Sequence, residues 1–562
     1  MKNIYPELEL EKILDQRLKS LKYFEPIDLV FNRDPRFGDL STPVALRIGK
    51  ARHMDPINVA EEIIRGLKWP RYVCDISISK PGYINFKLNT EFYLSALARP
   101  YKLPLKRYCA KQNILIEYSS PNIAKPFGVG HLRSTIIGDA VANLYAALEY
   151  KVTRVNHLGD WGTQFGKLIY AYKKWGDAEI VEQNPLPEML RLYVRFHGEA
   201  ELNPSFEGKA RYWFKKLEDG DEEAQTIWRK FTGWSLTEFK RIYDLLGVKF
   251  DETKGESSYI SSAKVIVDEL KRKRLATGSE GALVVKFTNE NITTALLMKN
   301  DGATLYLTRD LAALKYRLQS KKADVVIYHV GSEQTLHFQQ LFDIARRAGW
   351  AQEDQLIYAP HGLMRLPEGK MSTRLGKIVE LDKVLDEAVA RAYKIVDSKN
   401  HNLPKAQKDK IAKAVGIGAV KYNDLKNQRA TNITFDWDQM LSLQGNSAPY
   451  LQYTYARLKS IARNANTRAK VGRELNDDEL AIAQKIVTFP SVIAAAAYNQ
   501  SPNLLATYLH ELAGQMSEYY EKYPVIKAEP ATRRHRLAVI LSAASVLKSG
   551  LTLLGLQSPE EI

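Results

Sequence analysis

The chain has 562 residues, 45% of them hydrophobic, 26% charged and 10% aromatic, and its 81 basic and 65 acidic residues give a formal net charge of +16. The composition excludes a disordered or fibrous protein, the length predicts several domains, and the charge indicates either a phosphate-bearing partner or simply a basic enzyme. Two cysteines, with no C-x-x-C pair, exclude a disulfide-stapled scaffold.

The first section, residues 1–102, is predicted to be a small α+β domain. It opens on an amphipathic helical stretch and continues with a helical pattern from Pro43 to Leu67. Apolar and polar residues then alternate from Val73 to Leu88, as expected for strands, and prolines near residue 102 indicate a linker. No long apolar run follows the first lysine, so we expect no secretory signal and a cytoplasmic protein.

The second section, residues 103–384, is predicted to be an α/β domain of the Rossmann type, doubly wound, with insertions. A strand-like run begins at Asn113, a glycine-bearing loop follows, and apolar residues recur at helical spacing from His131 to Tyr150 before the next strand-like run. This βαβ order is typical of nucleotide-binding folds. A helical insertion occupies about residues 173–250. Later strand-like runs begin at Thr293, Ala303, Asp324 and Leu356.

The third section, residues 385–562, is predicted to be helical throughout. Its apolar run Leu537–Leu547 is roughly half as long as a bilayer span, so we predict a core helix and no membrane partner. The segment Tyr453–Arg473 has six basic residues and no acidic one, and tyrosines lie at its start. Basic and aromatic side chains suit contact with phosphates and unpaired bases, although a solvated helix face with tyrosines in the core explains this segment equally well.

One candidate phosphate site is Gly128-Val129-Gly130-His131, at the predicted junction of loop and helix. Glycines let a backbone approach a ligand closely, a helix N-terminus attracts phosphate, and His131 would donate a hydrogen bond there. An ordinary βα turn accounts for these four residues as well.

A second candidate is the basic segment Lys370-Met371-Ser372-Thr373-Arg374, with Gly369 and Gly376 on either side. Lysine is a point charge suited to a pyrophosphate that gains charge in the transition state. Taken alone, a solvated basic loop is the simpler interpretation.

The two candidates together resemble the H-x-G-H and K-M-S-K-S motifs of class I aminoacyl-tRNA synthetases, and among these of arginyl-tRNA synthetases. The resemblance covers essentially the whole chain and is carried by EYSSPNIAKPFGVGHLRSTIIGD, VNHLGDWGTQFGKL and KMSTR. Two positions depart from the pattern: Gly128 stands where the motif has its first histidine, and the second lysine of the loop is absent. The resemblance implies an N-terminal domain that contacts the tRNA elbow, a catalytic Rossmann domain and an all-α anticodon-binding domain.

The resemblance also implies the reaction. L-arginine would be activated with ATP to arginyl-adenylate, and arginine would pass to the 3′ terminal adenosine of tRNA(Arg), releasing pyrophosphate and AMP. Mg²⁺ is expected to arrive with ATP, without a permanent protein-bound metal, and a monomer is expected. His131, Lys370 and Lys125 are the expected catalytic residues. ATP contacts are expected from Gly128, Gly130, His131, His361, Gly362, Met364, Lys370, Met371 and Ser372.

Substrate arginine demands carboxylates, because a guanidinium pairs best with Asp or Glu. By resemblance, arginine is bound by Ser120, Pro121, Asn122, His131, Glu256, Tyr306, Asp310 and Gln334. Tyr306 and Asp310 are four residues apart, so one helical turn would bring both to one side. Asp310 alone would be interpreted as a helix N-cap. Contacts to tRNA are expected from Tyr450, Tyr453, Arg457 and Lys459.

Two alternatives stay open. One is another class I synthetase. The absence of cysteine ligands argues against the cysteine enzyme. The lack of an editing insertion argues against the valine, leucine and isoleucine enzymes. The other is a non-catalytic tRNA-binding relative. Gly128 favours it, whereas the presence of His131, Lys370, Asp310 and Gln334 argues against it.

Overall fold

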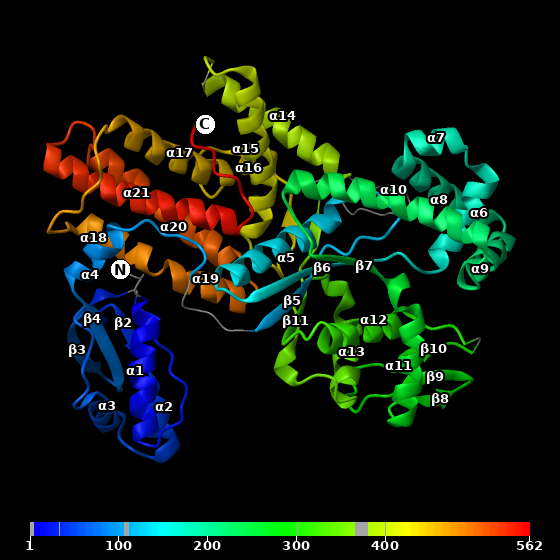
Figure 1. Cartoon of the computed structure of the whole chain (residues 1–562), viewed down its shortest axis with the longest axis horizontal. Coiled ribbons are helices and arrows are strands. Elements are labelled where there is room, and N and C mark those ends of the chain that lie inside the picture. Colours follow the sequence, from blue (N-terminus) through cyan, green and yellow to red (C-terminus); the bar gives the residue numbers. More distant parts are fainter. Residues whose placement is uncertain (1–4, 33, 106–111, 301, 366–379, 400) are drawn as a thin grey trace.

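The computed structural model describes residues 5–32, 34–105, 112–300, 302–365, 380–399 and 401–562. The predicted loop residues Lys370, Met371 and Ser372 lie outside these ranges. Figure 1 shows an N-terminal part beside the helices that end the chain, a central sheet, and a group of helices that projects from the sheet.

The N-terminal part is an antiparallel sheet of order β1-β2-β4-β3 with helices packed against it. The single helical stretch predicted from Pro43 to Leu67 is in fact two helices. His53 ends the first with a left-handed φ of 55°, and Asp55 caps the second by accepting from the Ile57 N–H. The elements are α1 (Pro6–Ser20), β1 (Val30–Phe31), β2 (Leu40–Thr42), α2 (Val44–Arg52), α3 (Pro56–Ile64), β3 (Val73–Ser79), β4 (Tyr83–Leu88) and α4 (Thr90–Leu97).

The central sheet is parallel and has the order β12-β11-β5-β6-β7. Its chain order reverses between β5 and β11, which is the switch point where open α/β sheets bind ligands. In Figure 1, α5 lies on one side of the sheet and α11, α12 and α13 on the other. The predicted doubly wound Rossmann-type domain is confirmed. Its strands are β5 (Asn113–Glu117), β6 (Lys151–Leu158), β7 (Glu252–Gly255), β11 (Val325–Tyr328) and β12 (Leu356–Tyr358).

Helices connect these strands, and the insertion between β6 and β7 is helical as predicted. The strand predicted to begin at Ala303 is wrong, because α12 begins at Tyr306 and buries Leu307, Leu311 and Leu314 at helical spacing. The elements are α5 (Val129–Ala147), α6 (Thr163–Trp175), α7 (Ala178–Gln183), α8 (Pro185–Leu202), α9 (Ser205–Glu218), α10 (Glu222–Leu246), α11 (Ile260–Arg272), β8 (Thr277–Ser279), β9 (Ala282–Val285), β10 (Ala295–Met298), α12 (Tyr306–Lys315) and α13 (Thr335–Arg347).

The C-terminal part is helical apart from the short strand β14, which pairs with β13. By length and composition, the segments Asp477–Tyr498 and Pro530–Leu553 could cross a membrane, but their apolar windows are 56% and 67% buried inside the protein. The predicted core helix at Leu537–Leu547 is confirmed as part of α21. The elements are β13 (Met364–Arg365), α14 (Leu381–Lys399), α15 (Lys405–Leu425), β14 (Ile433–Thr434), α16 (Trp437–Leu441), α17 (Ala448–Asn464), α18 (Asp477–Val487), α19 (Phe489–Tyr498), α20 (Asn503–Lys522) and α21 (Pro530–Leu553).

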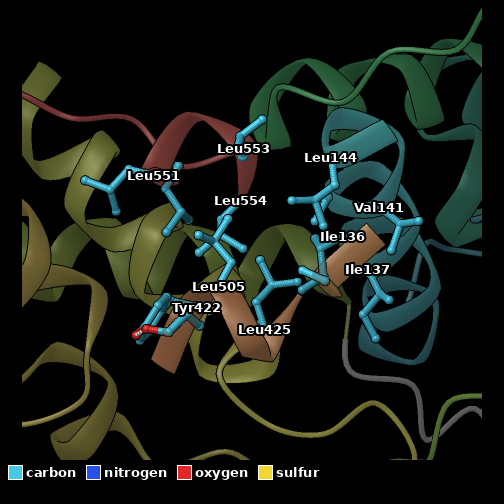
Figure 2. Close-up of a cluster of buried hydrophobic side chains, with 14 of the residues drawn as sticks. Ile136, Ile137, Val141, Leu144, Tyr422, Leu425, Leu505, Leu551, Leu553 and Leu554 are labelled. Atoms are coloured by element: carbon cyan, nitrogen blue, oxygen red, sulfur yellow. Dashed lines mark hydrogen bonds between the residues drawn. The ribbon is translucent and has the colours of Figure 1, made fainter. Parts of the chain in front are cut away.

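Helix α5 joins the sheet to the C-terminal helices. Figure 2 shows Ile136 and Leu144 of α5 facing Leu425 of α15 and Leu554 beyond α21, and all four are buried in one apolar cluster. Burying side chains of this size stabilises such an interface by roughly 1.5–3 kcal/mol each. The helix that begins at the candidate phosphate site therefore has its other end fixed among the C-terminal helices.

Candidate active site

The loop after β5 has a strained backbone. Ser119, Ser120 and Ala124 have φ values of 71°, 48° and 62°, in the left-handed region that favours glycine. Their N–H groups are held by side chains from other elements, namely Ser134 (2.9 Å), Asn156 (3.2 Å) and Ser235 (2.9 Å). A strained backbone of this kind persists where contacts from the surrounding structure hold it in place, and such backbone is concentrated at functional sites.

The predicted arginine-binding residues Ser120, Pro121 and Asn122 lie on this loop, against the end of β6. Gly159 donates from its N–H to the Pro121 carbonyl (3.1 Å) and accepts from the Ile123 N–H (3.1 Å). A Cβ at Gly159 would lie 2.1 Å from Asn122 Oδ1, so a larger residue there would displace the Asn122 side chain. The loop is thereby fixed at the carboxyl edge of the sheet.

His131 lies in the first turn of α5, as predicted. Burial, and next the charge of the Lys125 ammonium, lower its pKa to about 4, so the imidazole is neutral at pH 7. Its Nδ1 is buried without a hydrogen-bond partner among the described residues. The Lys125 Nζ lies 5.3 Å from the centre of the Tyr193 ring of α8.

The two glycines of this turn, Gly128 and Gly130, were both expected to let a ligand approach the backbone, and the structure supports this only for Gly130. Gly128 is the N-cap of α5 with φ −84°, an angle that any residue adopts, so the backbone does not require glycine there. Gly130 is exposed, and a Cβ there would have no protein atom within 4 Å. Open space at Gly130 fits the approach of a ligand to the helix N-terminus.

His361 and Gly362, predicted to hold adenine, follow β12 and lie beside the end of β11. The His361 N–H donates to the Val330 carbonyl (3.0 Å), and its Nδ1 lies 3.0 Å from the Gly362 carbonyl oxygen. A Cβ at Gly362 would lie 2.7 Å from the Ala430 carbonyl oxygen, so this close approach requires glycine. Met364 is buried in β13.

The chain also returns to the phosphate site after residue 379. Glu380 forms an antiparallel bridge with Gly128, and the Leu381 N–H donates to the Phe127 carbonyl (2.9 Å). The first described residues after the predicted K-M-S-type loop therefore lie directly beside the predicted H-x-G-H turn.

Asp310 and Tyr306 lie one turn apart on α12, as the four-residue spacing predicts. The alternative of an N-cap for Asp310 is wrong, because the cap of α12 is Leu305. Two histidines fix the Asp310 carboxylate: His337 Nε2 lies 2.8 Å from Oδ2 and His157 Nε2 lies 3.3 Å from Oδ1. Burial alone would raise the pKa of Asp310, but its contacts with these imidazoles hold the pKa below its ordinary value.

Glu256 is a second carboxylate near Asp310. It accepts from Arg309 Nε (2.9 Å), and Arg309 Nη2 lies 2.8 Å from Oε2. Burial, and next the Asp310 charge, raise the pKa of Glu256. Two carboxylates that repel each other at a partly buried site form a natural receptor for a cation.

Tyr306 and Gln334 complete this end of the site. The Tyr306 ring is 56% exposed and its centre lies 5.1 Å from that of His337. Gln334 is exposed in the short 3₁₀ turn Ser332–Gln334 that precedes α13, three residues before His337. No described contact joins Gln334 to Asp310 directly.

The predicted tRNA contacts all lie on α17, but not on one face. Tyr453 and Arg457 are exposed and one turn apart. Tyr450 is half-buried, with its hydroxyl 3.3 Å from Ser517 Oγ. Lys459 pairs with Glu560 (3.3 Å). The exposed face is therefore narrower than the sequence indicates.

Three residues with evident roles were not identified from the sequence. His157 and His337 bind Asp310, and Arg133 forms a fully buried ion pair with Asp424 of α15. His337 lies three residues after Gln334, and Arg133 two residues after His131, so proximity to the motifs was the available signal.

The parallel sheet, the turn at the start of α5 and the carboxylates Asp310 and Glu256 are the features expected of a class I aminoacyl-tRNA synthetase. The family model described as "tRNA synthetases class I (R), catalytic domain" matches residues 94–437. "Arginyl tRNA synthetase N terminal domain" matches residues 8–88 and "DALR anticodon binding domain" matches residues 451–562.

The chain belongs to the arginyl-tRNA synthetase family. It is 38% identical over 566 residues to an arginine–tRNA ligase of Halothermothrix orenii, covering 99% of each chain. It is 42% identical over 530 residues to one of an Exiguobacterium species, covering 93% of this chain and 94% of the relative. The solved arginyl-tRNA synthetase of Thermus thermophilus is similar with a TM-score of 0.85 and 25% identity over 99% of this chain and 100% of that one.

Proposed function

We propose that the chain charges tRNA(Arg) with arginine in two steps at the carboxyl edge of the sheet. The arginine carboxylate attacks the α-phosphorus of ATP, which breaks the bond to pyrophosphate and gives arginyl-adenylate. A ribose hydroxyl of the terminal adenosine of tRNA then attacks the arginyl carbonyl, and AMP leaves. The observation that carries this proposal is the pair of neighbouring carboxylates, Asp310 against His157 near the carboxyl end of β6 and Glu256 directly after β7.

In this proposal the guanidinium binds to Asp310 and Glu256, with Tyr306 and Gln334 at the pocket entrance. Ser120, Pro121 and Asn122, with His131, border the other end of arginine, where the reacting carboxylate must lie. The neutral His131 imidazole and the N–H groups of the α5 N-terminus donate to phosphate oxygens. The contact between Lys125 and Tyr193 leaves the ammonium near enough to lower the His131 pKa, so it adds positive charge there.

At the nucleotide, His361, Gly362 and Met364 form the adenine side and Gly128 and Gly130 the phosphate side. Lys370, Met371 and Ser372 are proposed for the pyrophosphate from the sequence motif alone. Mg²⁺ neutralises ATP in the substrate complex and keeps most of its water ligands. Because charge develops during an in-line displacement, fixed donors and positioning account for the catalysis.

The amino-acid specificity tests this function directly. Arginine, lysine and citrulline should be compared in pyrophosphate exchange and in tRNA charging. Citrulline has nearly the shape of arginine but no charge, so we expect its kcat/KM to be lower by roughly 10⁴-fold, because it brings no positive charge to the two carboxylates. Efficient charging of an amino acid other than arginine would overturn the proposal.

The pH dependence of the arginine KM should follow His157. Burial alone would lower its pKa, but Glu117 and the contact with Asp310 raise it above the ordinary value of 6.5. His157 is therefore protonated below this raised pKa, where its positive charge competes with the guanidinium for Asp310. We expect the arginine KM to rise by about 3- to 10-fold as the pH falls through this raised pKa.

The matched variants for this measurement are His157→Asn and, on the exposed surface of the N-terminal part, His53→Asn. His157→Asn should flatten the pH profile of the arginine KM, whereas His53→Asn should keep it. An unchanged profile in His157→Asn would assign the dependence to another group.

For tRNA binding we propose that the exposed face of α17, with Tyr453 and Arg457, contacts the anticodon region. Arg457→Gln should weaken tRNA binding about 5- to 10-fold and reduce the slope of log K against log salt by about 1. Lys459→Gln is the matched control. Because Lys459 already pairs with Glu560, its loss should change the affinity less than about twofold. Equal effects would show that the ion pair opens on binding.

Four further statements remain predictions. They are the division of the chain at residues 102 and 384, the elbow contact of the N-terminal part, the cytoplasmic location and the monomeric state. Size-exclusion chromatography with light scattering tests the oligomeric state, and an N-terminal variant scan of tRNA affinity tests the elbow contact.

A further inference from the structure

A single buried arginine joins three parts of the protein. The Arg133 guanidinium, in the second turn of α5, holds the Asp424 carboxylate of α15 through Nε (3.0 Å to Oδ2) and Nη2 (3.0 Å to Oδ1). Both side chains are only 1% exposed. Arg133 also donates to the carbonyls of Thr431 (2.6 Å) and Arg429 (3.2 Å).

The carbonyls that Arg133 binds belong to the segment that supports the adenine side. The Arg429 carbonyl oxygen accepts from the Gly362 N–H (2.9 Å) as well as from Arg133. The Arg429 side chain donates to the Pro360 carbonyl (3.1 Å), and the Leu363 N–H donates to Asn432 Oδ1 (2.7 Å). Strands β13 and β14 continue this pairing. The 429–434 segment is therefore hydrogen-bonded to 360–365 along its length.

Arg133 is two residues from His131 on the same helix. One end of α5 thus presents His131 to the phosphates, while Arg133 fixes the segment that carries His361 and Gly362. Because a guanidinium is a rigid planar fork, its simultaneous bonds to a carboxylate and two carbonyls fix directions as well as distances. The apolar contacts between α5 and α15 in Figure 2 keep the two helices at this separation.

We propose that Arg133 is a positioning residue for ATP: with Asp424 it sets the spacing between the phosphate side and the adenine side of the nucleotide site. The proposal rests on the assignment of these two sides under the proposed function. It makes helix α15 of the C-terminal part a structural component of the nucleotide site, although none of its residues is proposed to touch ATP. The described ion pairs and hydrogen bonds of Asp310 and Glu256 are to His157, His337 and Arg309, none of which belongs to this network. One link to the arginine side runs through the turn of Gln334, where the Ser332 N–H donates to the His361 carbonyl (3.0 Å).

The test compares the KM for ATP with the KM for arginine in pyrophosphate exchange. Arg133→Lys keeps the charge and loses the fork, and we expect the KM for ATP to rise about 10-fold while the KM for arginine stays within about twofold. A variant at this position can also lower stability, because an unpaired Asp424 would remain buried. Thermal melting should therefore accompany each measurement.

A double variant, Arg133→Met with Asp424→Leu, removes both charges together. Replacing a buried ion pair by apolar residues of similar volume is often neutral for stability. We expect this variant to fold with a Tm near that of the parent chain and still to show the raised KM for ATP, because no guanidinium donates to the carbonyls of Arg429 and Thr431.

Lys408 supplies the matched control. It lies on α15, and its Nζ binds Asp397 of α14 (2.6 Å) and the His401 carbonyl (2.9 Å), away from the nucleotide site. Lys408→Gln should change Tm without changing the ratio of the two KM values. An ATP KM within twofold of the parent in the double variant, or parallel rises of both KM values in Arg133→Lys, would overturn the proposal. Failure of the parent chain to charge arginine would instead contradict the proposed function.

Discussion

Asp310→Asn should raise the KM for arginine by roughly 10²- to 10³-fold. The substitution keeps the size of the side chain but removes the negative charge that His157 and His337 hold in place. Breaking one partner of a buried ion pair costs about 3–5 kcal/mol, and the lower half of that cost, about 3–4 kcal/mol, corresponds to this range. The measurement is arginine-dependent pyrophosphate exchange at saturating ATP. The KM for tRNA in the charging reaction should change little, because the proposed tRNA contacts lie on α17.

The matched control is Asp15→Asn, which removes a carboxylate paired with Lys19 on the exposed face of α1. It should leave every kinetic constant unchanged, since exposed ion pairs contribute about 0–1 kcal/mol. An Asp310→Asn chain that keeps its arginine KM but melts at a lower temperature would show that Asp310 supports the fold through its two histidines.

The Asp310 site also shows which features the sequence could predict. The i, i+4 spacing of Tyr306 and Asp310 is local, so it correctly predicts one helical face. The same stretch has tyrosine and threonine, which favour strands, and that local preference gave the wrong strand at Ala303. The burial of Leu307 and Leu311 decides the outcome, and burial depends on α11 and the sheet rather than on neighbouring residues.

Contacts between distant residues could not be predicted at all. His157 lies near the end of β6 and Asp310 lies on α12, so their contact exists only because the fold packs this helix against the carboxyl edge of the sheet. Arg133 is one of two charged residues, with Asp139, in the largely apolar helix α5, and its partner Asp424 is distant in the sequence. The phosphate turn, by contrast, is a local strand–loop–helix pattern, which is why the position of His131 was predicted correctly.

His131→Ala should lower the kcat of adenylate formation by roughly 10²- to 10³-fold, the usual effect of removing one donor that stabilises transition-state charge. With Gly128 in place of the first motif histidine, His131 is the one imidazole of this turn, so its loss has no local substitute. His131→Asn keeps an N–H donor and should recover part of the rate. The arginine KM should stay within about threefold, because its guanidinium binds at Asp310 and Glu256. His401→Ala, on an exposed turn, is the control.

The pH profile separates a donor from a charge at this position. Burial lowers the pKa of His131 to about 4, so the group is protonated only below that value and stays neutral from pH 6 to pH 8. We therefore expect no step near pH 6.5 from His131 in the kcat of pyrophosphate exchange at saturating arginine and ATP. The profile of His131→Asn should have the same shape as that of the parent chain. If such a step exists and disappears in the variant, the working form of His131 is the imidazolium, and the phosphate site depends on its charge. If the two profiles have the same shape, the N–H of a neutral ring beside the N-terminus of α5 is sufficient for catalysis at the phosphate site.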